Sequence, residues 1–288
     1  MSQNTTDSHG GWKAYDYYPS MAAAVIFVLL FLGSTFLHTY HLFRTRTWFF
    51  IPMVIGGYFE SIGYIGRALS AHQSPNWTLG PYVMQSTLLL IAPALFAASI
   101  YMELGRIIIL VHGEKHTLIR VNWMTKIFVA GDVLSFLMQA LGAGLMVKDS
   151  SSKETGNNVI IAGLFVQIVF FCFFLCSALV FQSRISKYPT SQSEVRYIPW
   201  RKHMYALHGS SFLILVRSIF RVIEYVEGQD GYLLQNEVFL YIFDALLMFS
   251  VLVIFIVIHP SEINCLLGKG KVMTSRAGLS LSEFSVAV

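Results

Sequence analysis

Three charged residues share one apolar segment at a spacing that would place them on a single helical face. Arg217, Arg221 and Glu224 lie within residues 203–226, where most other side chains are apolar. At about 100° per residue, a helix would hold all three within an arc of about 60°. A charge left at the centre of a bilayer costs about 2.5–3.5 kcal/mol on insertion scales. This face should therefore turn away from lipid and meet acidic groups of other segments.

Other apolar segments carry polar residues at helical spacing. Within residues 48–70, Glu60 and Arg67 share a face with two glycines, which would let a neighbouring helix approach closely. Because seven residues span about 10 Å of helix, each of the two charges should pair with another helix rather than with the other. Carboxylates suit a cationic head group such as an amine, and arginines suit a phosphate. We predict one polar stripe that binds substrate, made of Glu60, Arg67, Asp132, Gln139, Arg217, Arg221, Glu224, Glu237, Tyr241 and Asp244.

A purely structural role for these charges is the alternative interpretation. Buried charges must be paired wherever they occur, so the same residues could serve only to lock the helices together. Near the end of the apolar segment 80–110, Glu103 and Arg106 stand three residues apart and are predicted to form a local ion pair.

The composition is that of an integral membrane protein. The 288 residues are 55% hydrophobic and 12% charged, against about 25% charged in soluble domains. We predict an all-α membrane protein, a seven-transmembrane helix bundle, because seven segments reach the roughly 20 residues that a spanning helix needs. The basic residues fall mostly in the loops, and no binding of nucleic acid is expected. The predicted spans are about 19–42, 48–70, 80–110, 122–147, 158–182, 203–226 and 236–258.

The loop charges predict the orientation of the bundle. Thirteen Lys and Arg residues lie on one side of the spans and three on the other, which places the N-terminus outside and the C-terminus in the cytosol. Residues 1–18 then form an extracellular tail, 19–258 the membrane domain, and 259–288 a cytosolic tail whose Ser and Gly content predicts disorder. Two glycosylation sequons, at Asn4 and Asn76, fall on the predicted outer side.

The sequence has no motif typical of ATP hydrolysis or of metal-dependent hydrolysis. No GxxxxGK[ST] sequence is present, so neither ATP hydrolysis nor a cofactor is expected. An intramembrane lipid metallohydrolase stays a minor alternative because several histidines and one carboxylate could converge. No HExxH pattern supports it, and we predict neither a metal nor an enzymatic activity. The histidines and the carboxylate in question are His38, His41, His203, His208 and Asp132.

Several long strings of residues carry a family resemblance. The chain has GYFESIGYIGR at 57–67, LIAPALFAASIYMELGRII at 90–108, FVAGDVLSFLMQALGAG at 128–144, IAGLFVQIVFF at 161–171 and RSIFRVIEYVEGQDGYLLQNEVFLYIFDALLM at 217–248. With these strings it resembles the fungal lipid-translocating exporter family, the RTA-like seven-helix membrane proteins, over spans two to seven. Two positions depart mildly from the family pattern. Val238 stands where members often have Trp, and Leu247 stands where they often have Pro.

The resemblance implies a function at a membrane. It implies a multispanning protein of the plasma membrane or endomembranes, linked to stress resistance and to export or transbilayer movement of lipid-like amphiphiles. Sphingoid bases, phospholipids and toxic amphiphilic compounds are the substrates it implies. A seven-helix lipid sensor or receptor is the alternative, in which the loop 183–202 and the tail would contact cytosolic partners. The oligomeric state stays open, with a homo-oligomer among the alternatives.

Overall fold

The computed structural model describes residues 19–74, 77–148, 153–195, 198–228 and 231–269. In this part of the chain every regular element is a helix, and seven helices are long and apolar enough to cross a membrane. The predicted all-α bundle of seven spans is thereby confirmed. The first six spans are α1 (Met21–Thr45), α2 (Ile51–His72), α3 (Leu79–Leu110), α4 (Val121–Lys148), α5 (Lys153–Lys187) and α6 (Trp200–Glu227).

The seventh span consists of three consecutive pieces. It begins as α8 (Glu237–Leu240), passes through the π-helical segment η4 (Tyr241–Leu246) and continues as α9 (Leu247–Val257). A π-helical turn inside an α-helix is rare and often marks a functional site. Within the described residues, three short elements lie in the connections, namely η1 (Trp48–Phe50), η2 (Glu114–His116) and α7 (Tyr232–Gln235), and a fourth, α10 (Ser261–Leu266), follows the last span.

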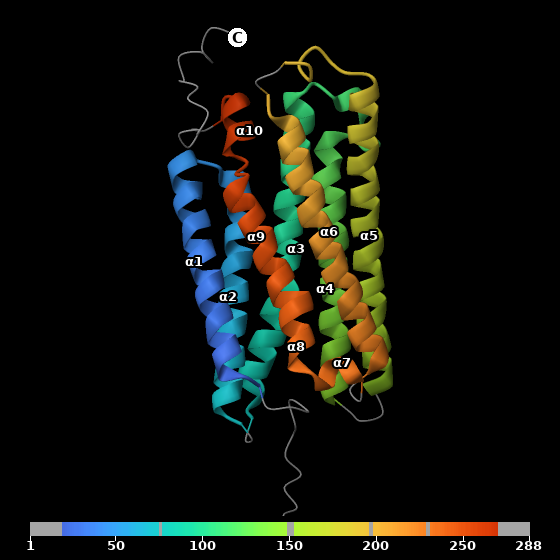
Figure 1. Ribbon diagram of the computed structural model, residues 1–288. Coiled ribbons are helices and arrows are strands. Elements are labelled where there is room, and N and C mark those ends of the chain that lie inside the picture. Colours follow the sequence, from blue (N-terminus) through green and yellow to red (C-terminus); the bar gives the residue numbers. More distant parts are fainter. Residues whose placement is uncertain (1–18, 75–76, 149–152, 196–197, 229–230, 270–288) are drawn as a thin grey trace, which may run out of the picture.

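The helices stand side by side with α3 in contact with several others (Figure 1). Consecutive spans from α1 to α6 pack against each other, and α3 also packs against α6. The last span closes the bundle because α9 contacts both α6 and α1. The beginning of α1 and the turn α7 lie at the lower end in Figure 1, and α10 lies at the upper end. Which end faces the cytosol stays a prediction from the loop charges.

Glycines allow two pairs of helices to approach closely. A Cβ atom added to Gly56 would lie 2.7 Å from the Phe96 ring and 3.0 Å from the carbonyl oxygen of Ala92. Between α4 and α5, a Cβ atom on Gly142 would lie 2.6 Å from the carbonyl oxygen of Gly156. Only a hydrogen fits at these positions, as in other close helix contacts within membranes.

The predicted disorder of the tail is wrong for its first part. Residues 261–266 form α10, in which Ser261, Ile263 and Asn264 are almost fully buried. Ile263 joins the main hydrophobic core, and this local contact is hidden when composition is averaged over the whole tail. Residues 270–288 and both sequons, at Asn4 and Asn76, lie outside the described residues.

Candidate functional site

A first buried ion pair joins α2 to the start of the seventh span. Nη2 of Arg67 lies 2.7 Å from Oε1 of Glu237, and its Nε donates to the hydroxyl of Tyr241 at 3.1 Å. Arg67 is fully buried, while the side chain of Glu237 is 14% exposed. Glu237 also accepts the backbone N–H of Ser20 at 2.8 Å, so it ties the beginning of α1 to the same point.

A second pair lies deeper and joins three helices. Nε of Arg217 on α6 donates to Oδ1 of Asp244 in η4 at 2.5 Å. Its Nη2 donates to the backbone carbonyl of Leu89 on α3 at 2.7 Å. Both charged side chains are only 2% exposed. Residues from α3, α6 and the π-helical segment are therefore held together by a single guanidinium.

The third pair is local to α6. Nη1 of Arg221 donates to Oε2 of Glu224 at 2.7 Å, three residues further along the same helix. These side chains are 12% and 8% exposed. The face predicted from the sequence thus turns inward, but only Arg217 reaches another helix for its carboxylate partner.

Glu60 is the fourth carboxyl group in this region, and it has no hydrogen bond within the described part of the chain. It is fully buried, and neither of its oxygens has a hydrogen-bond partner among the residues that the structure describes. The expectation that Glu60 pairs with another helix is therefore wrong, although it interacts electrostatically with Asp244, Arg217 and Arg221. Three arginines face four carboxyl groups here, and each arginine already has one carboxylate partner. We call these seven residues the charge network: Glu60, Arg67, Arg217, Arg221, Glu224, Glu237 and Asp244.

Two further polar atoms beside Glu60 are also without partners in the described structure. They are Oδ2 of Asp244 and the hydroxyl of Tyr64, one helical turn along α2 from Glu60. Tyr64 interacts electrostatically with both Glu60 and Asp244. Its ring stacks on Phe31 with centroids 5.5 Å apart, and it lies 6.1 Å from the ring of Tyr241. An aromatic wall from α1, α2 and η4 therefore borders the charge network.

Asp132 and Gln139, which the sequence placed in the same stripe, belong to a separate set of contacts. Asp132 accepts a hydrogen bond from the hydroxyl of Tyr101 at 3.0 Å, and Gln139 donates to Ser135 at 2.8 Å. Ser135 in turn donates to the backbone carbonyl of Gly163 at 2.7 Å. These bonds join α4 to α3 and α5, and none of those that the structure describes reaches the charge network. The predicted single stripe is thus divided in two.

The predicted pair of Glu103 and Arg106 is not formed. Glu103 instead lies 3.1 Å from Nδ1 of His203, and Nε2 of His203 lies 3.2 Å from Glu262 of α10. Arg106 donates to the side chain of Asn264 at 2.8 Å. This arrangement is not predictable from the sequence pattern, because residues 261–266 lie in the tail whose composition predicts disorder. These contacts hold α10 against α3 and α6, and they are made by Glu103, Arg106, His203, Glu262 and Asn264.

Two groups outside the spans titrate abnormally at this end. Hydrogen bonding to His203 lowers the pKa of the Glu262 carboxyl group. Burial lowers the pKa of His259 to about 3, and the neighbouring His38 and His41 act in the same direction. The ring of His259 lies 5.0 Å from that of His41. Among the described residues no group of three or more His, Cys, Asp or Glu side chains is arranged to hold a metal ion.

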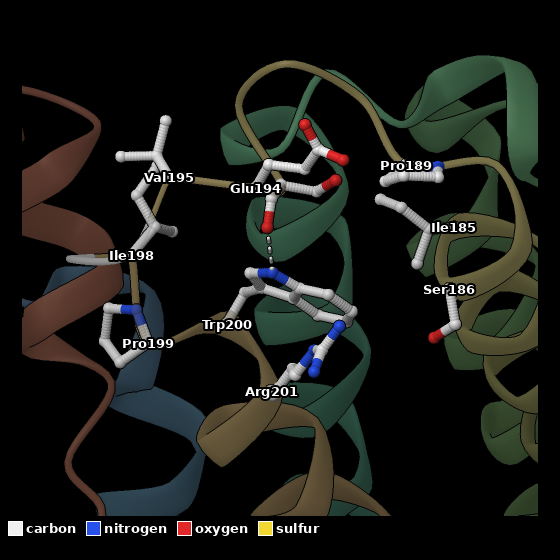
Figure 2. Close-up of a pocket in the computed structure, with 10 residues that line it drawn as sticks. Ile185, Ser186, Pro189, Glu194, Val195, Ile198, Pro199, Trp200 and Arg201 are labelled. Carbon is white, nitrogen blue, oxygen red and sulfur yellow. Dashed lines mark hydrogen bonds between the residues drawn. The ribbon is translucent and has the colours of Figure 1, made fainter.

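A cavity of about 410 Å³ lies where α5 ends and α6 begins (Figure 2). Ile185, Pro189, Glu194 and Trp200 are among its lining residues, and the indole of Trp200 donates to the carbonyl of Ser193 at 3.0 Å. Trp200 and Arg217 are 17 positions apart on α6, which corresponds to about 25 Å of helix. The cavity is therefore not part of the charge network.

Fold and site together define a class of protein. Seven membrane-spanning helices enclose the charge network, in which Glu60 has no hydrogen bond among the described residues, so this is a multi-pass membrane protein with a polar site inside its bundle. The family described as RTA1 like protein matches residues 53–265. The chain belongs to this family, as the resemblance implied.

Relatives from Saccharomyces cerevisiae support the same assignment. The chain is 39% identical to Protoporphyrin uptake protein 1, over 88% of this chain and 93% of that protein. It is 36% identical to Protein RTA1, over 87% of this chain and 86% of that protein. It is 28% identical to Sphingoid long-chain base transporter RSB1, over 89% of this chain and 74% of that protein. No solved structure matches the chain.

Proposed function

We propose that this protein moves lipid-like amphiphiles across the bilayer. In this mechanism the polar head group of the amphiphile passes along the charge network, while its apolar tail stays in the surrounding lipid. The network spares the head group the cost of entering hydrocarbon, where a polar group without partners is strongly disfavoured.

One observation carries the proposal. Glu60 places two carboxyl oxygens without hydrogen-bond partners, among the described residues, in a fully buried position inside the bundle. A carboxyl group used only to lock helices would be expected to have a bonded partner, as Glu237, Asp244 and Glu224 do. Polar groups within a membrane span are costly and usually mark a pathway for a substrate or an ion. Relatives named as an uptake protein and as a long-chain base transporter agree with a transport function.

The test is lipid movement in vesicles containing the purified protein. A labelled sphingoid base and a labelled phospholipid would be compared side by side, with empty vesicles as the background. We expect protein-dependent movement of at least one lipid and a strong reduction in Glu60→Gln and Asp244→Asn. Glu114→Gln is the matched control, because Glu114 is exposed in η2 and lies outside the network.

Each outcome separates the proposal from its alternative. Movement that is unchanged in both network variants would contradict a role for the network in transport. If neither lipid moves while the folded protein binds lipid saturably, the protein is better described as a lipid sensor.

A further inference from the structure

The number of charges in the network points to a proton on Glu60. Arg67, Arg217 and Arg221 each form an ion pair with one carboxylate, with nitrogen–oxygen distances of 2.7, 2.5 and 2.7 Å. If Glu60 were also ionised, the network would carry an uncompensated negative charge in a fully buried position. Removing such a charge from water is very unfavourable, and a proton is the simplest way to neutralise it.

The local contacts favour the same state. An ionised carboxylate at this position would be expected to attract donors, yet neither oxygen of Glu60 has one in the described structure. Arg217 lies close enough to interact electrostatically, but its Nε and Nη2 are used by Asp244 and by the carbonyl of Leu89. The charged and titratable groups that face Glu60 are Arg217 and Arg221 from α6, Asp244 from η4 and Tyr64 from α2.

The atoms without partners also indicate the ligand. Once Glu60 is ionised, both of its oxygens are acceptors, as is Oδ2 of Asp244, and the hydroxyl of Tyr64 can accept as well. A primary ammonium group has three N–H donors and a positive charge, so it matches such a set of acceptors. A phosphate does not, because it would need donors and the arginines beside Glu60 already have carboxylate partners.

We propose that Glu60 holds a proton in the ligand-free protein and releases it when the primary ammonium group of an amphiphile binds between Glu60 and Asp244. The inference rests on the proposed function and adds a ligand class and a proton exchange to it. The step is balanced: the neutral carboxyl group loses one proton to the aqueous phase and becomes a carboxylate, and one ammonium cation takes the place of that proton in the network. The net charge of the network is the same before and after binding.

Infrared difference spectroscopy tests the proton directly. The purified protein would be placed in nanodiscs, and sphinganine would be added as the primary ammonium probe. N-Acetylsphinganine, which has no charge, is the matched control ligand. We expect sphinganine to abolish one protonated-carboxyl band and to produce carboxylate bands, whereas the acetylated ligand leaves the spectrum unchanged. The signal should be missing in Glu60→Gln and retained in Glu114→Gln.

Carbon-13 labelling of glutamate shifts the glutamate carboxyl bands in the spectrum of the wild-type protein. A protonated glutamate can therefore be identified without any variant. A ligand-free wild-type protein without a protonated glutamate band would overturn the proposal by itself. Binding of sphinganine without loss of that band would overturn the exchange.

The outcome for the proposed function is read separately. Failure of sphinganine to bind, together with phospholipid movement in the vesicle assay, would overturn the ammonium assignment and leave lipid transport standing. Loss of the band on sphinganine binding without any lipid movement would support the proton exchange and contradict transport.

Discussion

Replacing Asp244 by Asn tests whether Glu60 can take its place as the carboxylate partner of Arg217. The substitution keeps the shape of the side chain but removes the carboxylate from Arg217, which is only 2% exposed and is otherwise bonded to the carbonyl of Leu89. Removing one partner of a buried pair typically costs about 3–5 kcal/mol. At 1.4 kcal/mol for each factor of ten, this corresponds to an increase of about 150- to 4,000-fold in the unfolded fraction.

Glu60 should reduce this cost. It interacts electrostatically with Arg217 and can release its proton to become a substitute partner. We therefore expect Asp244→Asn to fall at the lower end of the range, and Glu60→Gln alone to be nearly neutral. The double variant Glu60→Gln/Asp244→Asn should be clearly less stable than the sum of the two single changes predicts.

Unfolding in detergent micelles, followed by loss of helical circular dichroism in a denaturant series, would measure all three variants. A further variant, Arg217→Gln/Asp244→Asn, is the control, because it removes both charges of the pair and should recover part of the lost stability. Additive effects of Glu60→Gln and Asp244→Asn would refute the reasoning, since they would mean that Glu60 does not respond to Arg217.

Three further predictions test the packing, the pH response and the division of the stripe. Gly56→Ala should destabilise the protein by about 1–3 kcal/mol, because its Cβ would lie 2.7 Å from the Phe96 ring, whereas Gly144→Ala, with no atom within 4 Å, should be nearly neutral in thermal unfolding. Burial lowers the pKa of His259 to about 3 from an ordinary 6.5, so the unfolded chain binds the additional proton between these values and stability should fall as the pH drops below 6.5, by up to about 1.4 kcal/mol per unit. His259→Phe should reduce this slope, and an unchanged slope would show that another group is responsible. Asp132→Asn should leave lipid movement close to the wild-type rate while Glu60→Gln reduces it; equal losses in the vesicle assay would mean that the two sets of polar residues act as one pathway.

The seventh span connects the fold to the chemistry of the site. Tyr241 and Asp244, which contact Arg67 and Arg217, both lie in the π-helical segment η4. The wider turn changes the direction of these side chains relative to a regular α-helix. Tyr241 and Asp244, two members of the predicted polar stripe, are therefore positioned by a locally irregular backbone. A π-helical turn at this position is consistent with a functional site.

The sequence by itself determined the features that depend on local pattern. Hydropathy over about 20 residues defined each span, and helical periodicity placed Arg217, Arg221 and Glu224 on a face that turns inward. The close contact at Gly56 was also predictable, since a glycine on a polar face is where helices approach. The family followed from strings of residues that extend over six spans.

Only the tertiary structure decided which groups meet. Arg67 and Glu237 are 170 residues apart in the chain, and their contact depends on how α1, α2 and α8 are arranged in the bundle. The packing of the helices likewise leaves Glu60 without a hydrogen bond to any residue that the structure describes. It also brings Asp132 to Tyr101, and it brings Glu262 of α10 to His203. The physical reason is that a charged residue in a span requires a partner of opposite charge. The sequence offers several such residues in other spans and does not distinguish between them. The three-dimensional packing of the helices selects one of them.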